Sequence, residues 1–187
     1  MNRSSRMQPL LLLVLPLVAG CGYNTIQTLD ARVNQAQGQI QAQLQRRSDL
    51  IPNLVETVKG ITKQEDTVFI SIANARARLG GAVQSGNVPE MAAANQQLTQ
   101  GLGRLLAIAE NYPQLQSSQN FRQLQEQLEG TENRVAVARQ DYNAAVGEYN
   151  SYIRRFPYNL TAKIFGQGPR EYFEAAPGSE QAPEVKF

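Results

Sequence analysis

Several residue types that carry enzyme chemistry are missing or scarce in this sequence. Its 187 residues include no histidine, no tryptophan and a single cysteine, Cys21. Histidine is the commonest general base and a frequent metal ligand, and a free thiolate is a usual nucleophile. A di-iron bundle site also requires a glutamate followed by histidine three residues later. We therefore expect no catalytic residue, no metal and no cofactor.

The motifs of common enzyme classes are missing as well. The sequence contains no G-x-S-x-G elbow, no Gly-Lys-Ser/Thr phosphate loop and no dinucleotide-binding glycine pattern. Chemistry by carboxylates alone remains a distant alternative, a hydrolase of envelope polymers that uses Glu126, Glu129 and Glu132. At helical spacing, such residues more often form a solvated face or pair with arginine. The chain is predicted not to be an enzyme.

The N-terminal segment has the features of a lipoprotein signal peptide. A short basic region precedes an apolar run from Leu10 to Val18, and Leu17-Val18-Ala19-Gly20-Cys21 has the pattern of a lipobox. The run is shorter than the roughly 20 residues that a membrane span needs. We expect residues 1–20 to be cleaved off between Gly20 and Cys21, and Cys21 to carry lipid, with acyl chains such as palmitate.

Acylation at Cys21 predicts the location of the protein. A single acyl chain binds a membrane only marginally, whereas two or three hold a protein firmly. Gly22 stands where an aspartate would usually signal retention in the inner membrane. The expected location is therefore the outer membrane, facing the periplasm, if the host has two membranes.

The expected mature chain is electrically balanced. The sequence has 18 basic and 16 acidic residues, and cleavage removes Arg3 and Arg6 but no acidic residue, which leaves 16 of each sign. No basic excess is available to neutralise phosphates, so we expect no nucleic-acid partner.

Apolar residues recur in steps of three and four, which predicts helices throughout. The clearest stripe belongs to a helix from about residue 118 to residue 155, and no proline interrupts it. A helix of that length requires neighbouring helices for stability. The stripe consists of Phe121, Leu124, Leu128, Thr131, Val135, Ala138, Tyr142, Ala145, Tyr149, Tyr152 and Phe156.

Three further helices are predicted before it. The first covers the glutamine-rich stretch 35–45, whose residues favour a helix over a strand. The second has Asp49 as its N-cap and Pro52 in its first turn, and ends at Gly80-Gly81. The third begins with Asn87 as cap and Glu90 three residues later, as in a capping box, and stops before Tyr112-Pro113.

These helices predict an all-α protein, an antiparallel four-helix bundle over residues 21–160. The alternative is three long helices with a kink near Pro52. A break is favoured because Ile51, which precedes the proline, is pushed out of helical dihedrals. Residues 161–187 form a C-terminal extension that is disordered in part, with Phe165, Tyr172 and Phe173 able to fold back or to bind a partner.

A long ordered series of motifs resembles the LemA family from about Tyr23 to Phe173. The strongest match is QLQRRSDLIPNLVETVKG at residues 43–60. The resemblance implies a largely antiparallel helical bundle, exported or held at a bacterial membrane, with no settled biochemical activity. Most relatives resemble single-span membrane proteins at the N-terminus, and this chain departs from them by its lipobox. The other matches are LLAIAENYP at 105–113, Asn120-Phe121, Glu132-Asn133, Ala138-Arg139, Tyr142-Asn143, Tyr149-Asn150 and Phe156-Pro157.

Two sets of residues are candidate sites. The first is the family motif with Arg46, Arg47, Asp49, Pro52, Asn53 and Glu56. It forms either an interaction surface or a helix junction, in which Asp49 caps one helix and the arginines satisfy the last carbonyls of the preceding one. The second set is Tyr142, Asn143, Tyr149 and Asn150, which is predicted to fix helix register through buried hydrogen bonds rather than to bind a ligand.

The expected function is a non-enzymatic lipoprotein of the cell envelope, anchored through membrane lipid. Its helical bundle acts as an interaction module for an unidentified envelope protein. The alternative is a structural protein that forms homo-oligomers laterally at the membrane surface.

Overall fold

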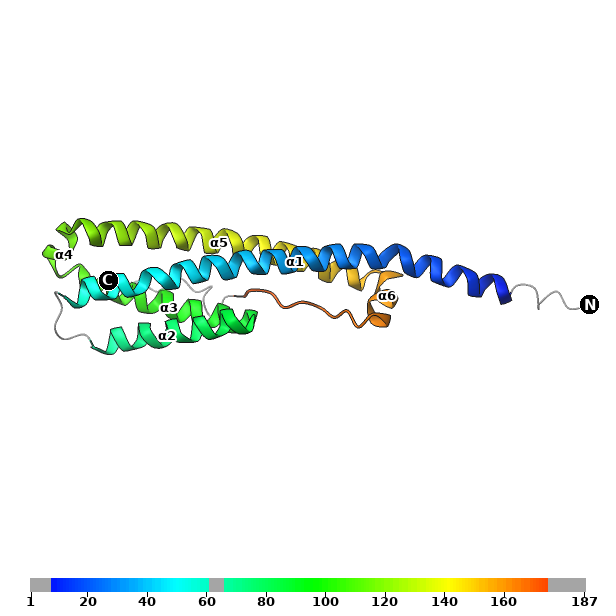
Figure 1. Ribbon diagram of the computed structural model, residues 1–187, viewed down its shortest axis with the longest axis horizontal. Helices are drawn as coiled ribbons and strands as arrows, with labels where there is room; N and C mark the ends of the chain where they lie inside the picture. The colour runs from blue at the N-terminus through cyan, green and yellow to red at the C-terminus, as the bar shows by residue number, and fades with distance from the viewer. Residues whose placement is uncertain (1–7, 61–65, 175–187) are drawn as a thin grey trace, which may run out of the picture. The chain divides into compact units, whose positions relative to one another are not determined.

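A computed structural model describes residues 8–60 and 66–174, the side chains from Gly22 onward. The all-α prediction is confirmed, because no described residue lies in a β-strand. The side chain of Cys21 and residues 175–187 of the predicted C-terminal extension 161–187 lie outside the described residues. The helices are α1 (Gln8–Lys59), α2 (Asp66–Ser85), α3 (Val88–Ala109), α4 (Pro113–Ser117), α5 (Gln119–Arg154) and α6 (Tyr158–Ile164) (Figure 1).

The chain divides into two compact units. The first contains residues 8–37 together with Asp141–Glu171. It therefore combines the N-terminal part of α1, the end of α5, all of α6 and the segment that follows α6. The second contains the described residues of Gly38–Gln140 and residues 172–174.

The predicted helix break at Pro52 is wrong, because α1 continues through it to Lys59. Asp49 is consequently no N-cap, and its carboxylate accepts a hydrogen bond from Gln45 Nε2 at 2.8 Å. Proline has no N–H to donate to the carbonyl four residues earlier, which is that of Ser48. Arg76 Nε from α2 donates to this carbonyl at 3.0 Å instead. A side chain from another helix thus replaces the missing donor.

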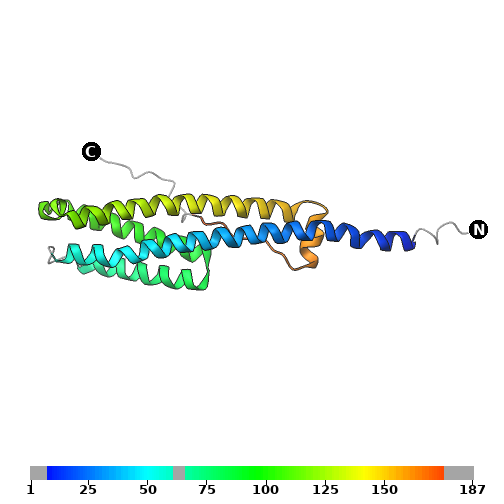
Figure 2. The same cartoon turned by 45° about the horizontal axis from the view of Figure 1, so that its top comes forward.

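The second predicted helix also has different bounds. α2 begins at Asp66 and passes through Gly80-Gly81 to Ser85, so the predicted end at the two glycines is wrong. The chain then turns at Gly86, whose φ of 70° is in the left-handed region that glycine adopts readily. Figures 1 and 2 both show α2 and α3 side by side after this turn. Among the described residues the long helices are α1, α2, α3 and α5, and α1 combines the first predicted helix with the beginning of the second.

The start of α3 is confirmed. Asn87 Oδ1 accepts a hydrogen bond from the Glu90 N–H at 3.1 Å, which satisfies one of the unpaired donors of the first turn. Gly101 is buried and faces Ile72 of α2, so that this pair of helices approaches closely there. The buried residues of α3 include Met91, Ala94, Leu98, Leu102, Leu105 and Ala109.

The predicted apolar stripe of α5 agrees with the buried residues in the first part of the helix, but it is wrong at the end. Phe121, Val135 and Tyr142 are buried, but Phe156 is 79% exposed and lies beyond the end of the helix at Arg154. An α-helix has 3.6 residues per turn, so a strict 3.5-residue spacing rotates away from the buried face. The buried side chains after Tyr142 are accordingly Val146, Tyr149, Asn150 and Ile153.

The segment after α6 contains the three aromatic residues that were expected either to fold back or to bind a partner. Phe173 is buried, whereas Phe165 is 49% and Tyr172 is 39% exposed. Residues 167–174 form no helix or strand. Side chains rather than a backbone ladder must therefore hold this segment in place.

Candidate functional site

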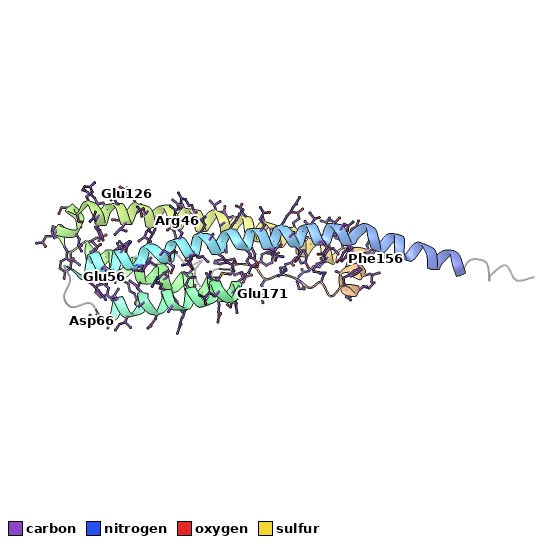
Figure 3. The ribbon with its side chains drawn as sticks, in the orientation of Figure 1. Arg46, Glu56, Asp66, Glu126, Phe156 and Glu171 are labelled. Atoms are coloured by element: carbon purple, nitrogen blue, oxygen red, sulfur yellow. The ribbon has the colours of Figure 1, made fainter. Side chains whose placement is uncertain are left out.

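A groove lies between α1 and α2 in the second unit. Its volume is about 630 Å³, and both helices contribute apolar side chains to it. Figure 3 labels Glu56, close to the end of α1, and Asp66, at the start of α2. The residues that matter here are Ser48, Ile51, Pro52, Val55 and Glu56 from α1 and Phe69, Ile70, Ala73 and Ala77 from α2.

The groove has an apolar wall and a charged rim. Phe69 is buried, and the Lys59 ammonium lies 5.3 Å from the centre of its ring, within the range of a cation–π contact. Ile70 is 58% exposed although it is a large apolar side chain. Glu56, Lys59 and Asp66 supply charges of both signs. Such a surface suits an apolar side chain flanked by polar groups.

Arg47 is the buried charge of the second unit. Only 4% of its surface is exposed, and it joins α1 to α3 and α5. Its Nη1 donates to Asn95 Oδ1 at 2.6 Å, its Nη2 donates to Thr99 Oγ1 at 3.1 Å, and Nη2 forms an ion pair with Glu132. Burial lowers the pKa of the guanidinium, an effect that the Glu132 carboxylate opposes. The Arg47 side chain therefore connects three helices, and its hydrogen-bond and ion-pair partners are side chains rather than the carbonyls at a helix C-terminus.

The other motif residues lie on the surface of α1. Arg46, Asp49, Asn53 and Glu56 are exposed, and Pro52 is partly covered. The helix-junction interpretation of this motif is wrong, because all these residues lie inside one helix. The structure thus separates the motif into one buried residue, Arg47, and a set on the helix surface, of which Pro52 and Glu56 line the groove.

The three candidate carboxylates have different surroundings. Glu132 pairs with Arg47, and Glu129 accepts a hydrogen bond from Gln125 at 3.4 Å. Glu126 borders a shallow hollow beside Arg46. Within residues 8–60 and 66–174, no group of three or more histidine, cysteine, aspartate or glutamate side chains is placed to hold a metal.

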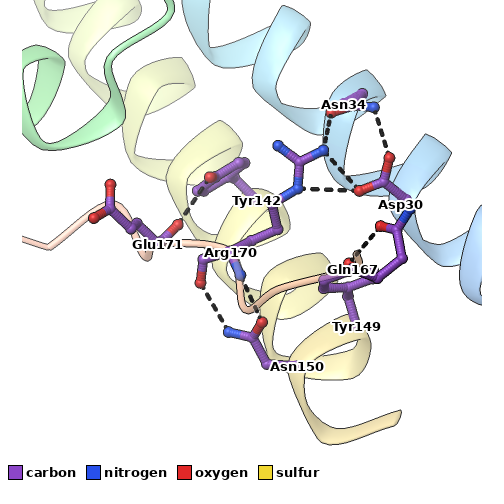
Figure 4. Close-up of polar contacts among 8 residues, drawn as sticks. All are labelled: Asp30, Asn34, Tyr142, Tyr149, Asn150, Gln167, Arg170 and Glu171. Carbon is purple, nitrogen blue, oxygen red and sulfur yellow. Dashed lines mark hydrogen bonds and ion pairs between the residues drawn. The ribbon is translucent and has the colours of Figure 1, made fainter. Parts of the chain in front are cut away.

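A polar cluster in the first unit holds the segment that follows α6 (Figure 4). The Arg170 guanidinium donates to Asp30 Oδ1 on α1 through Nε at 3.0 Å and through Nη2 at 2.7 Å. Nη2 also donates to Asn34 Oδ1 at 3.2 Å. The ion pair is partly covered, since the Asp30 side chain is 18% and the Arg170 side chain 39% exposed.

Three of the four predicted tyrosine and asparagine residues contact the same segment. Asn150 forms two hydrogen bonds with the backbone of Arg170, at 2.8 and 2.9 Å. Tyr142 Oη donates to the Glu171 carbonyl at 2.8 Å, and Tyr149 Oη donates to Gln167 Oε1 at 3.0 Å. The fourth residue, Asn143, is half-buried. The side chains therefore hold an extended segment, a role that the periodicity of α5 does not reveal.

The two tyrosines are shielded from solvent in this cluster. Burial raises the pKa of Tyr142, with Arg170 opposing and Glu171 adding to the effect. Burial also raises the pKa of Tyr149, with Asp30 adding to the effect and Arg170 opposing it. Both phenols thus remain protonated donors over the physiological pH range.

None of the helices within the described residues combines the length and the hydrophobicity that a bilayer span requires.

Comparison with known proteins identifies relatives over most of the chain. The magnetosome proteins MamQ 1 and MamQ 2 of Paramagnetospirillum magneticum are each 29% identical to it over 181 residues. Magnetosome protein MamQ of Magnetospirillum gryphiswaldense is 27% identical over 183 residues. Each match covers 84% of this chain and 66% of the relative, so the chain spans about two thirds of the length of these proteins.

A family model gives the classification. The model of the LemA family matches residues 36–187, which include both the groove and the polar cluster residues of α5. The resemblance of the motif at residues 43–60 is thereby confirmed. The chain belongs to the LemA family.

Proposed function

We propose that this protein is a non-enzymatic lipoprotein of the cell envelope whose groove between α1 and α2 binds another envelope protein. The observation that carries the proposal is the groove itself, which is formed in part by the motif residues Ser48, Pro52 and Glu56. The proposal includes an antiparallel four-helix bundle, an acylated Cys21 and a location at the outer membrane, facing the periplasm.

The dimensions and chemistry of the groove support a protein partner. Its volume of about 630 Å³ is sufficient for a few side chains. The exposed Ile70 lies beside the buried Phe69, and charges of both signs border them. An amphipathic helix that places apolar residues in such a groove and polar residues at its rim is a common form of recognition. We expect a partner segment of this kind.

Crosslinking tests the groove. A photoreactive amino acid in place of Ile70 is expected to trap a specific envelope protein in cells. The substitutions Ala73→Arg and Ala77→Arg put long charged side chains at exposed groove positions and should abolish the adduct. The control is Ala107→Arg, at an exposed position of α3 outside the groove lining. An adduct that survives the groove substitutions, or no adduct at all, would contradict the proposal.

The anchor is tested by the intact mass of the protein purified from its native membrane. A mass that corresponds to a chain starting at Cys21 with a diacylglyceryl and an acyl group is expected, and the Cys21→Ser variant should lose this modification. An unmodified mass that includes residues 1–20 would refute the lipid anchor. The groove proposal would still stand in that case, because crosslinking at position 70 does not depend on acylation.

A further inference from the structure

The short helix α6 presents an apolar surface to solvent. Phe156, Leu160 and Ile164 follow one another at four-residue intervals, and they are 79%, 51% and 74% exposed. Thr161 and Ala162, on the other side of the helix, are buried. Leu160 and Ile164 lie four residues apart within α6 and share one helix face, and Phe156 lies in the turn that precedes the helix. Three large apolar side chains exposed at one short helix mark this surface as a contact site.

α6 is fixed in this orientation by its ends and by its neighbours. Gly166 ends it with a φ of 66°, and hydrogen bonds run from Gln167 N to the Ala162 carbonyl and from Gly166 N to the Lys163 carbonyl. These two bonds form the Schellman motif. The ring of Tyr158, the first residue of α6, stacks on Tyr152 of α5 with a centroid distance of 4.4 Å. The exposed face is thus a property of the folded unit.

Cationic residues lie close in sequence to the exposed apolar residues. Arg154, Arg155 and Lys163 are exposed, and none of them forms an ion pair with a described residue. No acidic residue occurs between Glu148 and Glu171. Long basic side chains can keep their charge in water while their aliphatic stems follow an apolar surface. Together with aromatic and aliphatic side chains they form the combination found in interfacial membrane helices.

The same helix and Phe165, which follows it, pack on α1 at Gly22 and Tyr23. A Cβ atom on Gly22 would lie 2.5 Å from Tyr158 Cδ1, so glycine is required for the contact. The next residue, Tyr23, has its ring 4.4 Å from the ring of Phe165. α6 is consequently in contact with the residue that follows Cys21.

We infer that Phe156, Leu160 and Ile164 insert into the surface of a lipid membrane, with Arg154, Arg155 and Lys163 bound to anionic headgroups. The inference rests on the proposed anchor at Cys21, since acyl chains there would bring Gly22 and α6 to the membrane. The lipid anchor then supplies attachment, and α6 supplies a second contact that fixes the orientation of the first unit. Two attachments on one folded unit reinforce each other because the second is intramolecular.

The experiment uses the lack of tryptophan in the sequence. Full-length protein carrying Leu160→Trp is reconstituted in vesicles of phosphatidylethanolamine and phosphatidylglycerol, with or without brominated lipid. We expect a blue-shifted emission and a loss of intensity with the brominated lipid. Ile70→Trp is the matched control, because Ile70 is an exposed apolar residue of similar exposure, 58% against 51%. Solvent-like, unquenched emission from Trp at position 160 would overturn the inference.

A second variant pair tests the charges. Arg155→Gln with Lys163→Gln should reduce the quenching at position 160 and remove its dependence on phosphatidylglycerol. Arg104→Gln with Arg122→Gln removes two exposed arginines elsewhere and should leave the quenching unchanged. Equal effects of the two pairs would overturn the headgroup contact. A concentration-dependent blue shift without vesicles would assign the surface to a second copy of the chain and overturn the lipid contact.

Flotation of the vesicles separates this inference from the anchor. Protein that floats but shows unquenched Trp at position 160 overturns the role of α6 and leaves the anchor intact. Quenching that persists in the Cys21→Ser background supports α6 as a lipid contact independent of acylation. Absence of flotation in both backgrounds contradicts the anchor and the α6 contact together.

Discussion

Arg76 Nε donates a hydrogen bond of 3.0 Å to the carbonyl of Ser48, the carbonyl that Pro52 deprives of its usual backbone donor. The two helices concerned are α1 and α2, which also form the groove. Ser48 is buried, so a carbonyl without a donor would be costly at this position. The continuity of α1 through the proline therefore depends on a contact from α2.

A double-mutant cycle tests this dependence. Arg76→Met keeps most of the side-chain volume but leaves the Ser48 carbonyl without its donor, so we expect a loss of about 1–2 kcal/mol in the free energy of unfolding. In a Pro52→Ala background, the restored backbone N–H should reduce the cost to less than about 0.5 kcal/mol. Urea unfolding followed by circular dichroism measures both values. Equal costs in the two backgrounds would show that Arg76 does not compensate for the proline.

The same contact explains which parts of the fold were predictable. The Asn87 cap was predictable because donor and acceptor lie three residues apart. The passage of α1 through Pro52 was not, because the compensating Arg76 is 28 residues away from Ser48. Local rules describe a proline without its tertiary partners, and they correctly predict a break for an isolated helix.

The candidate sites were likewise predictable only where they depend on residues close together in the sequence. The motif around Pro52 was identified from sequence, but the other side of its groove was not. Phe69 is buried and Ile70 is exposed, and no motif in the sequence singles out either residue as part of a groove. The contact of Tyr142 with the Glu171 carbonyl was also not predictable from the sequence, because residues 167–174 have no periodic pattern.

Asn150 and Arg170 provide a second test. Asn150 Nδ2 donates to the Arg170 carbonyl, and Asn150 Oδ1 accepts from the Arg170 N–H. Asn150→Ala removes both bonds at a buried position, and we expect a loss of about 1–3 kcal/mol in the free energy of unfolding. Asn24→Ala, at an exposed position of α1, should change it by less than about 0.5 kcal/mol.

Hydrogen exchange gives the Asn150 experiment a local readout. The amide of Arg170 should exchange faster in Asn150→Ala than in the parent protein, because its acceptor has been removed. Unchanged exchange at Arg170 together with unchanged stability would mean that Asn150 does not hold the segment.

Because Arg47 is buried, removing the charge of Glu132 alone should destabilise the protein more than removing both charges of the ion pair. Glu132→Gln leaves a buried guanidinium without its anionic partner, and we expect a loss of about 1–3 kcal/mol, reduced by the partial exposure of Glu132. Arg47→Met combined with Glu132→Gln removes both charges and should be less destabilising than Glu132→Gln alone. Glu129→Gln, at an exposed position of the same helix, is the control. A double variant that is less stable than the single variant would contradict the argument.

The raised pKa values of Tyr142 and Tyr149 predict alkaline sensitivity. A tyrosine in the unfolded chain has a pKa of about 10. Because the folded state retains these protons to higher pH, the resulting stabilisation is complete below about pH 10 and is lost as the pH rises through the folded-state pKa. The free energy of unfolding should therefore fall more steeply above about pH 10 in the parent protein than in the Tyr142→Phe and Tyr149→Phe double variant.

Urea unfolding at about pH 8 and at about pH 10.5 provides the comparison for these tyrosines. The Tyr172→Phe variant controls for the removal of a phenol outside the polar cluster. Parallel pH dependence in the parent protein and the double variant would show that the two phenols are not shielded as the structure indicates.

Gly101 and Gly103 form a matched pair on α3. A Cβ atom on Gly101 would lie 2.9 Å from Cγ1 of the buried Ile72, whereas a Cβ atom on Gly103 would have no neighbour within 4 Å. Gly101→Ala should therefore destabilise the protein by about 1–3 kcal/mol through overpacking. Gly103→Ala should stabilise it by about 0.5–1 kcal/mol, because alanine loses less backbone entropy in a helix. Urea unfolding of the two variants would show opposite signs if the close contact between α2 and α3 is as described, and the same sign for both would contradict it.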